Sequence, residues 1–187
     1  APKNMGNSNL KWENSAEINL GVNMSFLKNR ISADIEVYNK KTNDLIQAVA
    51  IPTSLGFSSV TANVGKLLNR GIEITLNTVN IQKKNFRWNS TINFSTNHNE
   101  ILELYGGTVT KDYANKLFVG KSLKTNFYYK FDGIWQLADS TAAKGFGQVP
   151  GSVKVVDQNK DGKISSSTGV DDRVVLGSEL PKWITGI

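Results

Sequence analysis

The residues best suited to chemistry in this chain lie near its carboxyl end and offer oxygen ligands to a cation. Asp157, Asn159 and Asp161 stand at positions one, three and five of a short segment, and Gly162 stands at position six. Three oxygen-bearing side chains at this spacing converge on one hard cation, and the glycine permits a sharp turn, so the pattern is typical of the start of a calcium loop. The backbone carbonyl of Lys163 would supply the ligand at position seven. We therefore predict a structural Ca²⁺ site here.

The end of this segment, residues 157–172, departs from the usual pattern. A bidentate glutamate is expected at position twelve, but Thr168 occupies it, and Asp171 and Asp172 follow three and four residues later. Either aspartate could close the site after a longer loop. The alternative interpretation is an Asx-rich turn that is held together by hydrogen bonds from side chains to the backbone, without a metal.

Aromatic residues form the second candidate site. Five of them lie close together in the sequence: Phe127, Tyr128, Tyr129, Phe131 and Trp135. Of these, Tyr128, Tyr129 and Trp135 have polar tips that could contact a sugar or a protein partner. The alternative is that the cluster forms a small core of its own segment.

Nothing in the sequence indicates an enzyme or a nucleic-acid-binding protein. The chain has one histidine, His98, and no cysteine. We expect His98 at the surface near a strand end, and carboxylates such as Glu100 and Glu103 in a solvated loop. With these residues, the chain offers no set of acid, base and nucleophile for catalysis. The net charge is +6, but no basic run is interleaved with aromatic residues along one face, as a nucleic-acid interface would require.

The elements that would position these residues are strands. Large apolar residues alternate with small polar ones from Ile18 to Phe26, and again from Ile31 to Val37 after a tight turn at Lys28 and Asn29. Such alternation gives a strand one apolar and one polar face. The same pattern predicts four strands in two hairpins, at residues 16–27, 30–39, 69–79 and 86–97.

Two environments would satisfy these two-faced strands. In a secreted β-sandwich the apolar face packs against a second sheet. In a membrane barrel the apolar face meets lipid, and the Asn, Ser, Thr and Gly residues of the other face line a wet lumen. Each strand has close to the roughly 9–11 residues that cross a bilayer when tilted. No apolar run is long enough for a membrane-spanning helix. Phe86 and Trp88 lie where an interfacial aromatic girdle would be.

Several segments, in this order and at this spacing, resemble one family, the SusC/RagA-type TonB-linked outer-membrane transporters. These segments are LKWE at 10–13, FLKNR at 26–30, VYNKKTNDLI at 37–46, NVGKLLNRGIE at 63–73, NEILEL at 99–104, GIWQ at 133–136, and the stretch from Pro150 and Gly151 through DQNKDGKI at 157–164 to Asp172, Arg173 and Gly177. They cover nearly the whole chain.

The resemblance implies an all-β fold, an antiparallel up-and-down meander within a barrel of about 22 strands that surrounds a plug. Residues 1–97 would be four barrel strands, residues 98–182 a long extracellular loop region or an even number of further crossings, and residues 183–187 the start of the next strand. The chain would be an internal piece without the plug or the TonB-contacting segment.

The resemblance also implies a function. It points to uptake of oligosaccharides or peptides across the bacterial outer membrane, together with a SusD-like surface lipoprotein and, through parts outside this chain, the TonB complex. The alternative is a secreted β-sandwich binding module with a calcium-stabilised loop.

Overall fold

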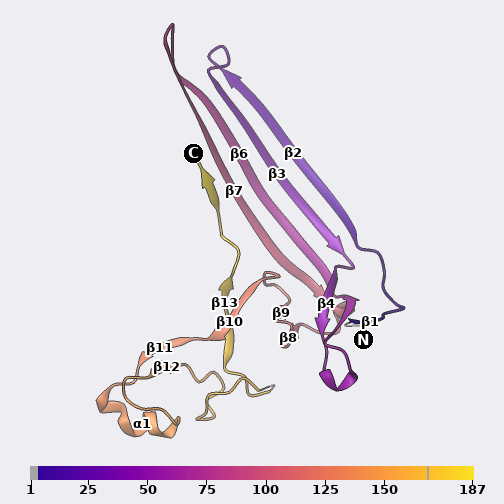
Figure 1. The fold of residues 1–187 in the computed structure, drawn as a ribbon, viewed down its shortest axis with the longest axis vertical. Coiled ribbons are helices and arrows are strands. Elements are labelled where there is room, and N and C mark those ends of the chain that lie inside the picture. The colour runs from indigo at the N-terminus through magenta and orange to yellow at the C-terminus, as the bar shows by residue number, and fades with distance from the viewer. Residues whose placement is uncertain (1–3, 168) are drawn as a thin grey trace. The chain divides into compact units, whose positions relative to one another are not determined.

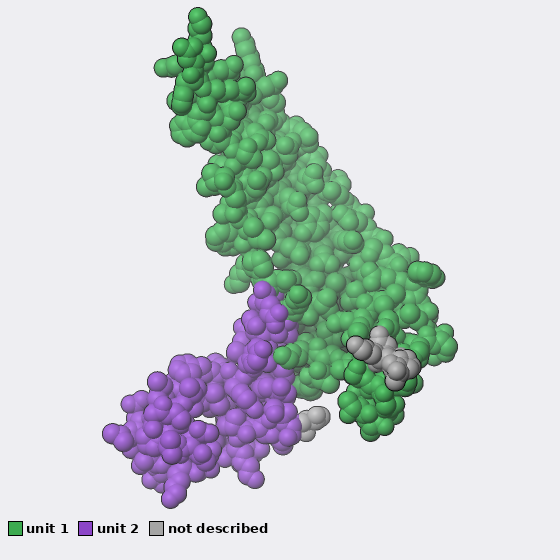
Figure 2. Space-filling view, in the orientation of Figure 1, with its two compact units in different colours: residues 1–124, 180–187 green, residues 125–179 purple. Residues whose placement is uncertain are grey.

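The protein, seen in a computed structural model that describes residues 4–167 and 169–187, consists mainly of antiparallel strands (Figure 1). It divides into two compact units (Figure 2). Unit 1 contains residues 1–124 and 180–187, and unit 2 contains residues 125–179. The predicted fold class, an antiparallel all-β meander, is confirmed. Thr168, which the sequence places at position twelve of the calcium-type loop, lies outside the described residues.

A five-stranded sheet dominates unit 1. Its strands are β2 (Asn14–Phe26), β3 (Ile31–Asn43), β6 (Gly65–Lys83), β7 (Phe86–Leu104) and β14 (Ile184–Gly186). They are paired in the order β14-β7-β6-β3-β2, and every pairing is antiparallel. Strands β6 and β7 have 19 residues each, so both extend several residues beyond the bounds that the alternation predicted. His98, Glu100 and Glu103 therefore lie within β7, and the prediction that placed these carboxylates in a loop is wrong.

The turn between β2 and β3 is wider than the sequence indicated. Leu27, Lys28 and Asn29 all adopt left-handed backbone conformations, with φ of 54°, 56° and 65°. The backbone N–H of Arg30 closes the turn by donating to the carbonyl of Phe26 at 3.1 Å. Leu27 and Arg30 thus belong to the turn, because the last register pair of the hairpin joins Phe26 to Ile31.

Shorter elements complete unit 1 at the end of the sheet opposite the β2–β3 turn. The three-stranded sheet β1-β5-β4 consists of Asn4–Met5, Ser59–Asn63 and Ile46–Ala50, and a two-stranded ribbon joins β8 (Lys111–Asp112) to β9 (Leu117–Phe118). Two 3₁₀ turns, Thr53–Leu55 and Tyr105–Gly107, lie in the connections. The core of unit 1 is here, where Leu67, Ile101, Leu104 and Leu117 pack together.

Unit 2 has two small antiparallel ribbons and one short helix. One ribbon joins β10 (Thr125–Tyr129) to β13 (Arg173–Ser178), and the other joins β11 (Phe131–Ile134) to β12 (Val153–Val155). The 3₁₀ turn Leu137–Asp139 leads into helix α1 (Ser140–Gly145). No helix among the described residues is long and apolar enough to span a membrane.

Candidate functional site

The main sheet carries its large apolar side chains on one face. Register pairs join Val22 to Ile35, Ile35 to Ile74 and Ile74 to Phe94, and paired residues of neighbouring strands point to the same side. The described residues place no second sheet over this face: Ile18 and Leu20 are 70% and 71% exposed. Within residues 4–167 and 169–187, this face therefore has no opposing layer of the kind that a β-sandwich needs.

The apolar band crosses the strands obliquely. Its last large residue is Ile18 on β2 and Phe94 on β7, and the register places Phe94 level with Val22, four residues nearer the turns than Ile18. Four extended residues cover about 14 Å, and the three strand spacings between β2 and β7 also cover about 14 Å. The band thus makes an angle of about 45° with the strands, which is the tilt of strands in outer-membrane barrels.

The aromatic residues expected at the band's edge lie on the apolar face near the β6–β7 turn. Phe86 and Trp88 alternate with Arg87 and point to the same side as Phe94. They are 57% and 53% exposed. Exposed aromatic residues at one end of an apolar face are also typical of the girdles of outer-membrane barrels.

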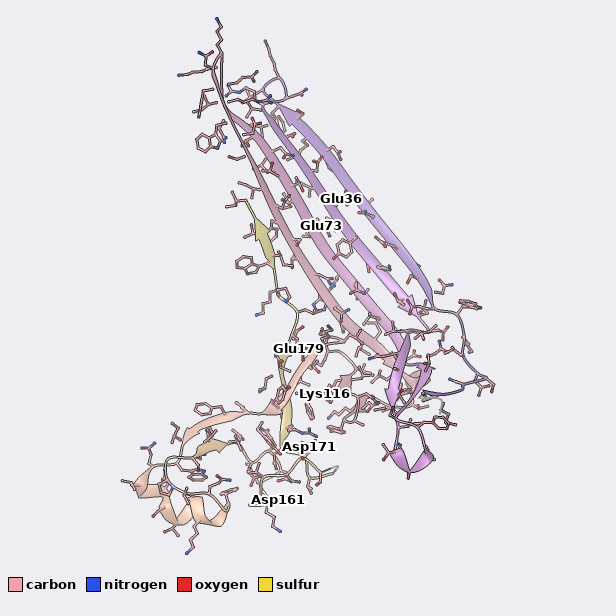
Figure 3. The ribbon with its side chains drawn as sticks, viewed as in Figure 1. Glu36, Glu73, Lys116, Asp161, Asp171 and Glu179 are labelled. Atoms are coloured by element: carbon pink, nitrogen blue, oxygen red, sulfur yellow. The ribbon has the colours of Figure 1, made fainter. Side chains whose placement is uncertain are left out.

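The opposite face of the sheet is polar and contains an acidic group that the sequence did not single out. Glu36 on β3 and Glu73 on β6 form a direct register pair, and Figure 3 shows them on adjacent strands. Like charges directly opposite one another destabilise a sheet. The amide of Asn19 donates to Glu36 at 3.4 Å. Both glutamates fall on polar positions of the alternation, so the signal was present, but their juxtaposition depends on the register between β3 and β6.

The acidic loop of unit 2 is held by its own side chains. The two carboxylate oxygens of Asp157 accept from the backbone N–H groups of Lys160 (2.6 Å) and Gly162 (2.8 Å). Asn159 Oδ1 accepts from the N–H of Asp161 at 3.0 Å, and Asp161 Oδ1 accepts from the N–H of Lys163 at 2.8 Å. The three side chains thus fold around one short turn. Gly162 has φ of 80°, so the predicted need for glycine at this position is met.

The two candidate closing residues have different environments. Asp172 is fully buried, and its oxygens accept from the N–H groups of Gln158 and Ser165, both at 2.8 Å. Asp171 instead forms a bidentate pair with Arg173, at 2.9 Å and 2.8 Å. The hydrogen bonds from Arg173 lower the pKa of Asp171, and those to Asp171 raise the pKa of Arg173. Asp172 therefore joins the two ends of the loop, whereas Asp171 is turned to Arg173.

In the described part of the chain, no group of three or more His, Cys, Asp and Glu side chains is placed to hold a metal ion. A cation in this loop would need the amide of Asn159 and backbone carbonyls among its ligands, as calcium loops commonly have. The oxygen side chains of Asp157, Asn159 and Asp161 suit Ca²⁺. In the structure these oxygens accept hydrogen bonds from backbone N–H groups of the turn, and those of Asp172 accept from Gln158 and Ser165.

The aromatic residues of unit 2 divide into buried and exposed members. Phe127 and Trp135 are 2% and 7% exposed, and Trp135 packs against Phe146 with ring centroids 5.7 Å apart. Arg173 lies over the ring of Phe127 at 4.8 Å. Tyr128 is half exposed and Tyr129 is partly buried. Among the three predicted contact residues, Tyr128 thus presents the most surface, while Trp135 belongs to the core of unit 2.

A further polar group that the sequence analysis missed lies at the core end of unit 1. The hydroxyl of Tyr105 donates to Asp112 at 2.6 Å, and Asp112 also accepts from the backbone and amide N–H groups of Asn115. Burial and the hydrogen bond to Asp112 raise the pKa of Tyr105. Asn115 in turn accepts from the backbone N–H of Ala50, which connects β4 to the β8–β9 ribbon.

Comparisons with known proteins place this geometry in context. The sequence model of a family described as TonB dependent receptor-like, beta-barrel, matches residues 2–171. The chain is 40% identical over 191 residues to TonB-dependent receptor P26 of Formosa agariphila. This match covers 96% of the chain and 19% of the relative. It is 40% identical over 109 residues to TonB-dependent receptor SusC of Bacteroides thetaiotaomicron, covering 58% of this chain and 11% of SusC.

Among solved structures, the RagAB peptide transporter matches with a TM-score of 0.74 and 25% identity, over 97% of this chain and 20% of that chain. The RagAB peptide importer in its 'open-open' state matches in fold with a TM-score of 0.67. P26 and the RagAB transporter match nearly all of this chain, and the chain spans about a fifth of the length of each.

Proposed function

This chain belongs to the TonB-dependent receptor-like β-barrel family, and we propose that it forms part of the wall of an outer-membrane transporter that imports oligosaccharides or peptides. The observation that carries the proposal is the oblique apolar band, because it suits strands that cross a bilayer at about 45°. The polar reverse face of the sheet then lines the lumen. The relatives are named as receptors, and their names describe no enzyme.

The proposed orientation puts the β2–β3 and β6–β7 turns in the periplasm and the opposite end of the sheet outside the cell. Short turns on the periplasmic side and long connections on the outer side are typical of outer-membrane barrels. Residues 98–182, apart from the end of β7, would then form an extracellular region.

Spin labels in the parent protein, reconstituted in lipid, test which face of the sheet meets lipid and which meets water. A label at Leu20 should respond to a lipid-soluble relaxant such as oxygen, and a label at Asn23 to a water-soluble one. Leu20 and Asn23 lie on opposite faces of β2, because they are an odd number of residues apart. A slip of the strand by one residue would therefore exchange the environments of both. The reverse accessibility at both positions would contradict the proposal.

The substrate and the partner rest on the relatives. RagAB is named as a peptide transporter, and SusC is a receptor of the same family. We propose a large nutrient as the substrate and a SusD-like surface lipoprotein as the partner. Tyr128 and Tyr129 are the candidate contacts, and Trp135, which is 7% exposed, would support them from the core of unit 2. The exposure of Tyr128 favours it as the first to test.

The partner and the substrate can be tested together in cells. Tyr128→Ala in the parent protein should reduce uptake of the nutrient or co-purification of the lipoprotein, while Phe127→Leu, at the buried neighbouring position, serves as the control for folding. Unchanged uptake and unchanged co-purification with Tyr128→Ala would remove this residue from the site.

For the acidic loop we propose a structural Ca²⁺ held by Asp157, Asn159, Asp161 and the carbonyl of Lys163, with Asp172 favoured over Asp171 as the closing ligand. Asp172 already contacts the start of the loop at Gln158 and its middle at Ser165, whereas Asp171 is paired with Arg173. Extracellular calcium sites bind at roughly 10⁻⁴–10⁻³ M. Calorimetric titration of calcium into the chelator-stripped parent protein, compared with Asp161→Ala, tests the site: equal heats from both would exclude it.

A further inference from the structure

The end of the main sheet that carries the β2–β3 and β6–β7 turns has an unusually uniform charge. Five basic residues lie in or beside these turns, and residues 24–33 and 79–97 contain no acidic residue. The five are Lys28, Arg30, Lys83, Lys84 and Arg87. Figure 1 shows both turns at the same end of the sheet.

Two of these cations are engaged within the sheet. Arg30 donates to the carbonyls of Val79 and Asn80, at 3.0 Å and 3.1 Å. It thereby holds the irregularity at which the β6–β7 register shifts between Val79 and Ile81. Arg87 donates to the amide oxygen of Asn89 at 3.3 Å, on the polar face.

The three lysines remain available for a ligand. Lys28, Lys83 and Lys84 are all exposed, and within the described residues no hydrogen bond or ion pair involves their side-chain amines. Lys83 pairs in register with Phe86, so its side chain leaves the strand on the apolar face, beside the aromatic residues.

The stagger of the two turns matches the slope of the apolar band. Strand β6 continues five residues past Thr78, the residue that pairs with Ile31 beside the other turn. The band moves in the same direction from β2 to β7. A membrane plane drawn parallel to this slope, at the turn end of the band, therefore passes close to both turns. Lys83 and Lys84 lie just beyond Phe86 and Trp88, and Lys28 lies in the other turn.

We propose that Lys28, Lys83 and Lys84 form a binding site for the phosphate-bearing headgroups of anionic phospholipids in the membrane leaflet at the turn end. The charges are complementary, because the cluster is purely basic and these headgroups are anionic. Phe86 and Trp88 would contact the glycerol and upper acyl region beneath the headgroup. The inference rests on the proposed function, since it requires the apolar band to lie in a bilayer.

The experiment measures lipid selectivity of the full-length parent protein. The protein is incorporated into bilayer nanodiscs of equal phosphatidylglycerol and phosphatidylcholine, and the lipids that stay bound are quantified by native mass spectrometry. The test variant is Lys28→Gln/Lys83→Gln/Lys84→Gln. The control, Lys11→Gln/Lys111→Gln/Lys121→Gln, removes the same charge from exposed lysines of unit 1 outside the two turns.

We expect enrichment of phosphatidylglycerol on the wild type and on the control. In the test variant, the enrichment of phosphatidylglycerol should fall by a factor of about five for each lysine that contacts a headgroup. The effect should shrink in 0.5 M salt, because screening weakens exposed charges. Equal enrichment of phosphatidylglycerol on the test variant and on the control would overturn the site. In a parallel experiment with lipid A present, retention of lipid A in place of phosphatidylglycerol would also overturn it.

A second measurement does not depend on the triple variant. A fluorophore on Asn85→Cys, in the turn beside Lys84, should be quenched more strongly by headgroup-spin-labelled phosphatidylglycerol than by the matching phosphatidylcholine. Equal quenching by both would overturn the lipid site while leaving the transporter proposal intact. A parent protein that does not enter bilayers would instead contradict the proposed function itself.

Discussion

The main sheet of unit 1 and the acidic loop of unit 2 are stabilised in opposite ways. The central part of the sheet has a continuous ladder of backbone hydrogen bonds and leaves Ile18, Leu20 and Val22 more than half exposed. Unit 2 has short ribbons but buries Phe127, Trp135 and Asp172. The apolar face of the sheet is thus left to its surroundings, which the proposed function makes lipid, whereas the loop depends on a few specific contacts of its own.

The comparison also separates two kinds of polar residue. On the sheet, polar side chains alternate along whole strands, and each contributes to the character of a face. In the loop, each polar side chain has a particular backbone partner, as Asp172 has in Gln158 and Ser165. We expect substitutions in the sheet to act through the environment of the face, and those in the loop through the loss of named hydrogen bonds.

The largest effect should come from a charge placed in the apolar band. Leu20→Arg in the reconstituted parent protein should lower the free energy of unfolding by about 2–4 kcal/mol, because lipid-facing arginine is costly near the midplane. Urea unfolding in lipid vesicles measures it. Asn23→Arg, on the polar face, is the matched control and should cost far less. Equal costs at the two positions would end the distinction between the faces.

A slightly smaller effect is expected at the buried carboxylate of unit 2. Asp172→Ala leaves the N–H groups of Gln158 and Ser165 without an acceptor, which should cost about 2–3 kcal/mol of local stability. Hydrogen exchange at these two amides measures it, and both should exchange faster. Asp132→Ala, which removes an exposed ion pair with Lys154, is the control and should leave them unchanged.

Calcium should stabilise unit 2 and leave unit 1 unchanged. If it binds the folded loop only, calcium at ten times its dissociation constant stabilises unit 2 by about 1.4 kcal/mol. Hydrogen exchange should slow in residues 157–172 and stay the same in β2 and β3. Protection that disappears in Asp172→Asn but persists in Asp171→Asn would identify the closing ligand, and uniform protection of both units would point to a non-specific effect.

The smallest effect is a dependence on pH in unit 2. The pKa of Asp171 is lowered by Arg173, so the pair contributes stability that is complete above the ordinary aspartate value of 3.8 and is lost as pH falls through the lowered pKa. We expect a loss of no more than about 1 kcal/mol below about pH 4. Exchange rates across unit 2 between pH 3 and 6 measure it. In Asp171→Asn this component should vanish, and its persistence would assign it to another carboxylate.

The two faces of the sheet and the family could be predicted from the residues alone. Strict alternation from Ile18 to Phe26, and again from Ile31 to Val37, fixes which side chains share a face, because the period of a strand is two whatever its neighbours are. The predicted strands therefore correspond to β2, β3, β6 and β7, and the resemblance to TonB-linked transporters agrees with the family that the comparisons identify. The spacing of Asp157, Asn159 and Asp161 predicted a calcium loop or an Asx-rich turn; the structure shows the turn, and the Ca²⁺ stays a prediction.

The relations between neighbouring strands and between distant loop residues could not be predicted from the sequence, because they depend on how the chain folds. The slope of the apolar band, the opposition of Glu36 and Glu73, and the common position of the two lysine-bearing turns all depend on register, which alternation within one strand cannot fix. The same holds for Asp171 and Asp172. They are neighbours in sequence and equal in chemistry, yet Asp171 is turned to Arg173 and Asp172 is buried. Asp172 accepts from the backbone N–H groups of Gln158 and Ser165, which only the fold brings next to it.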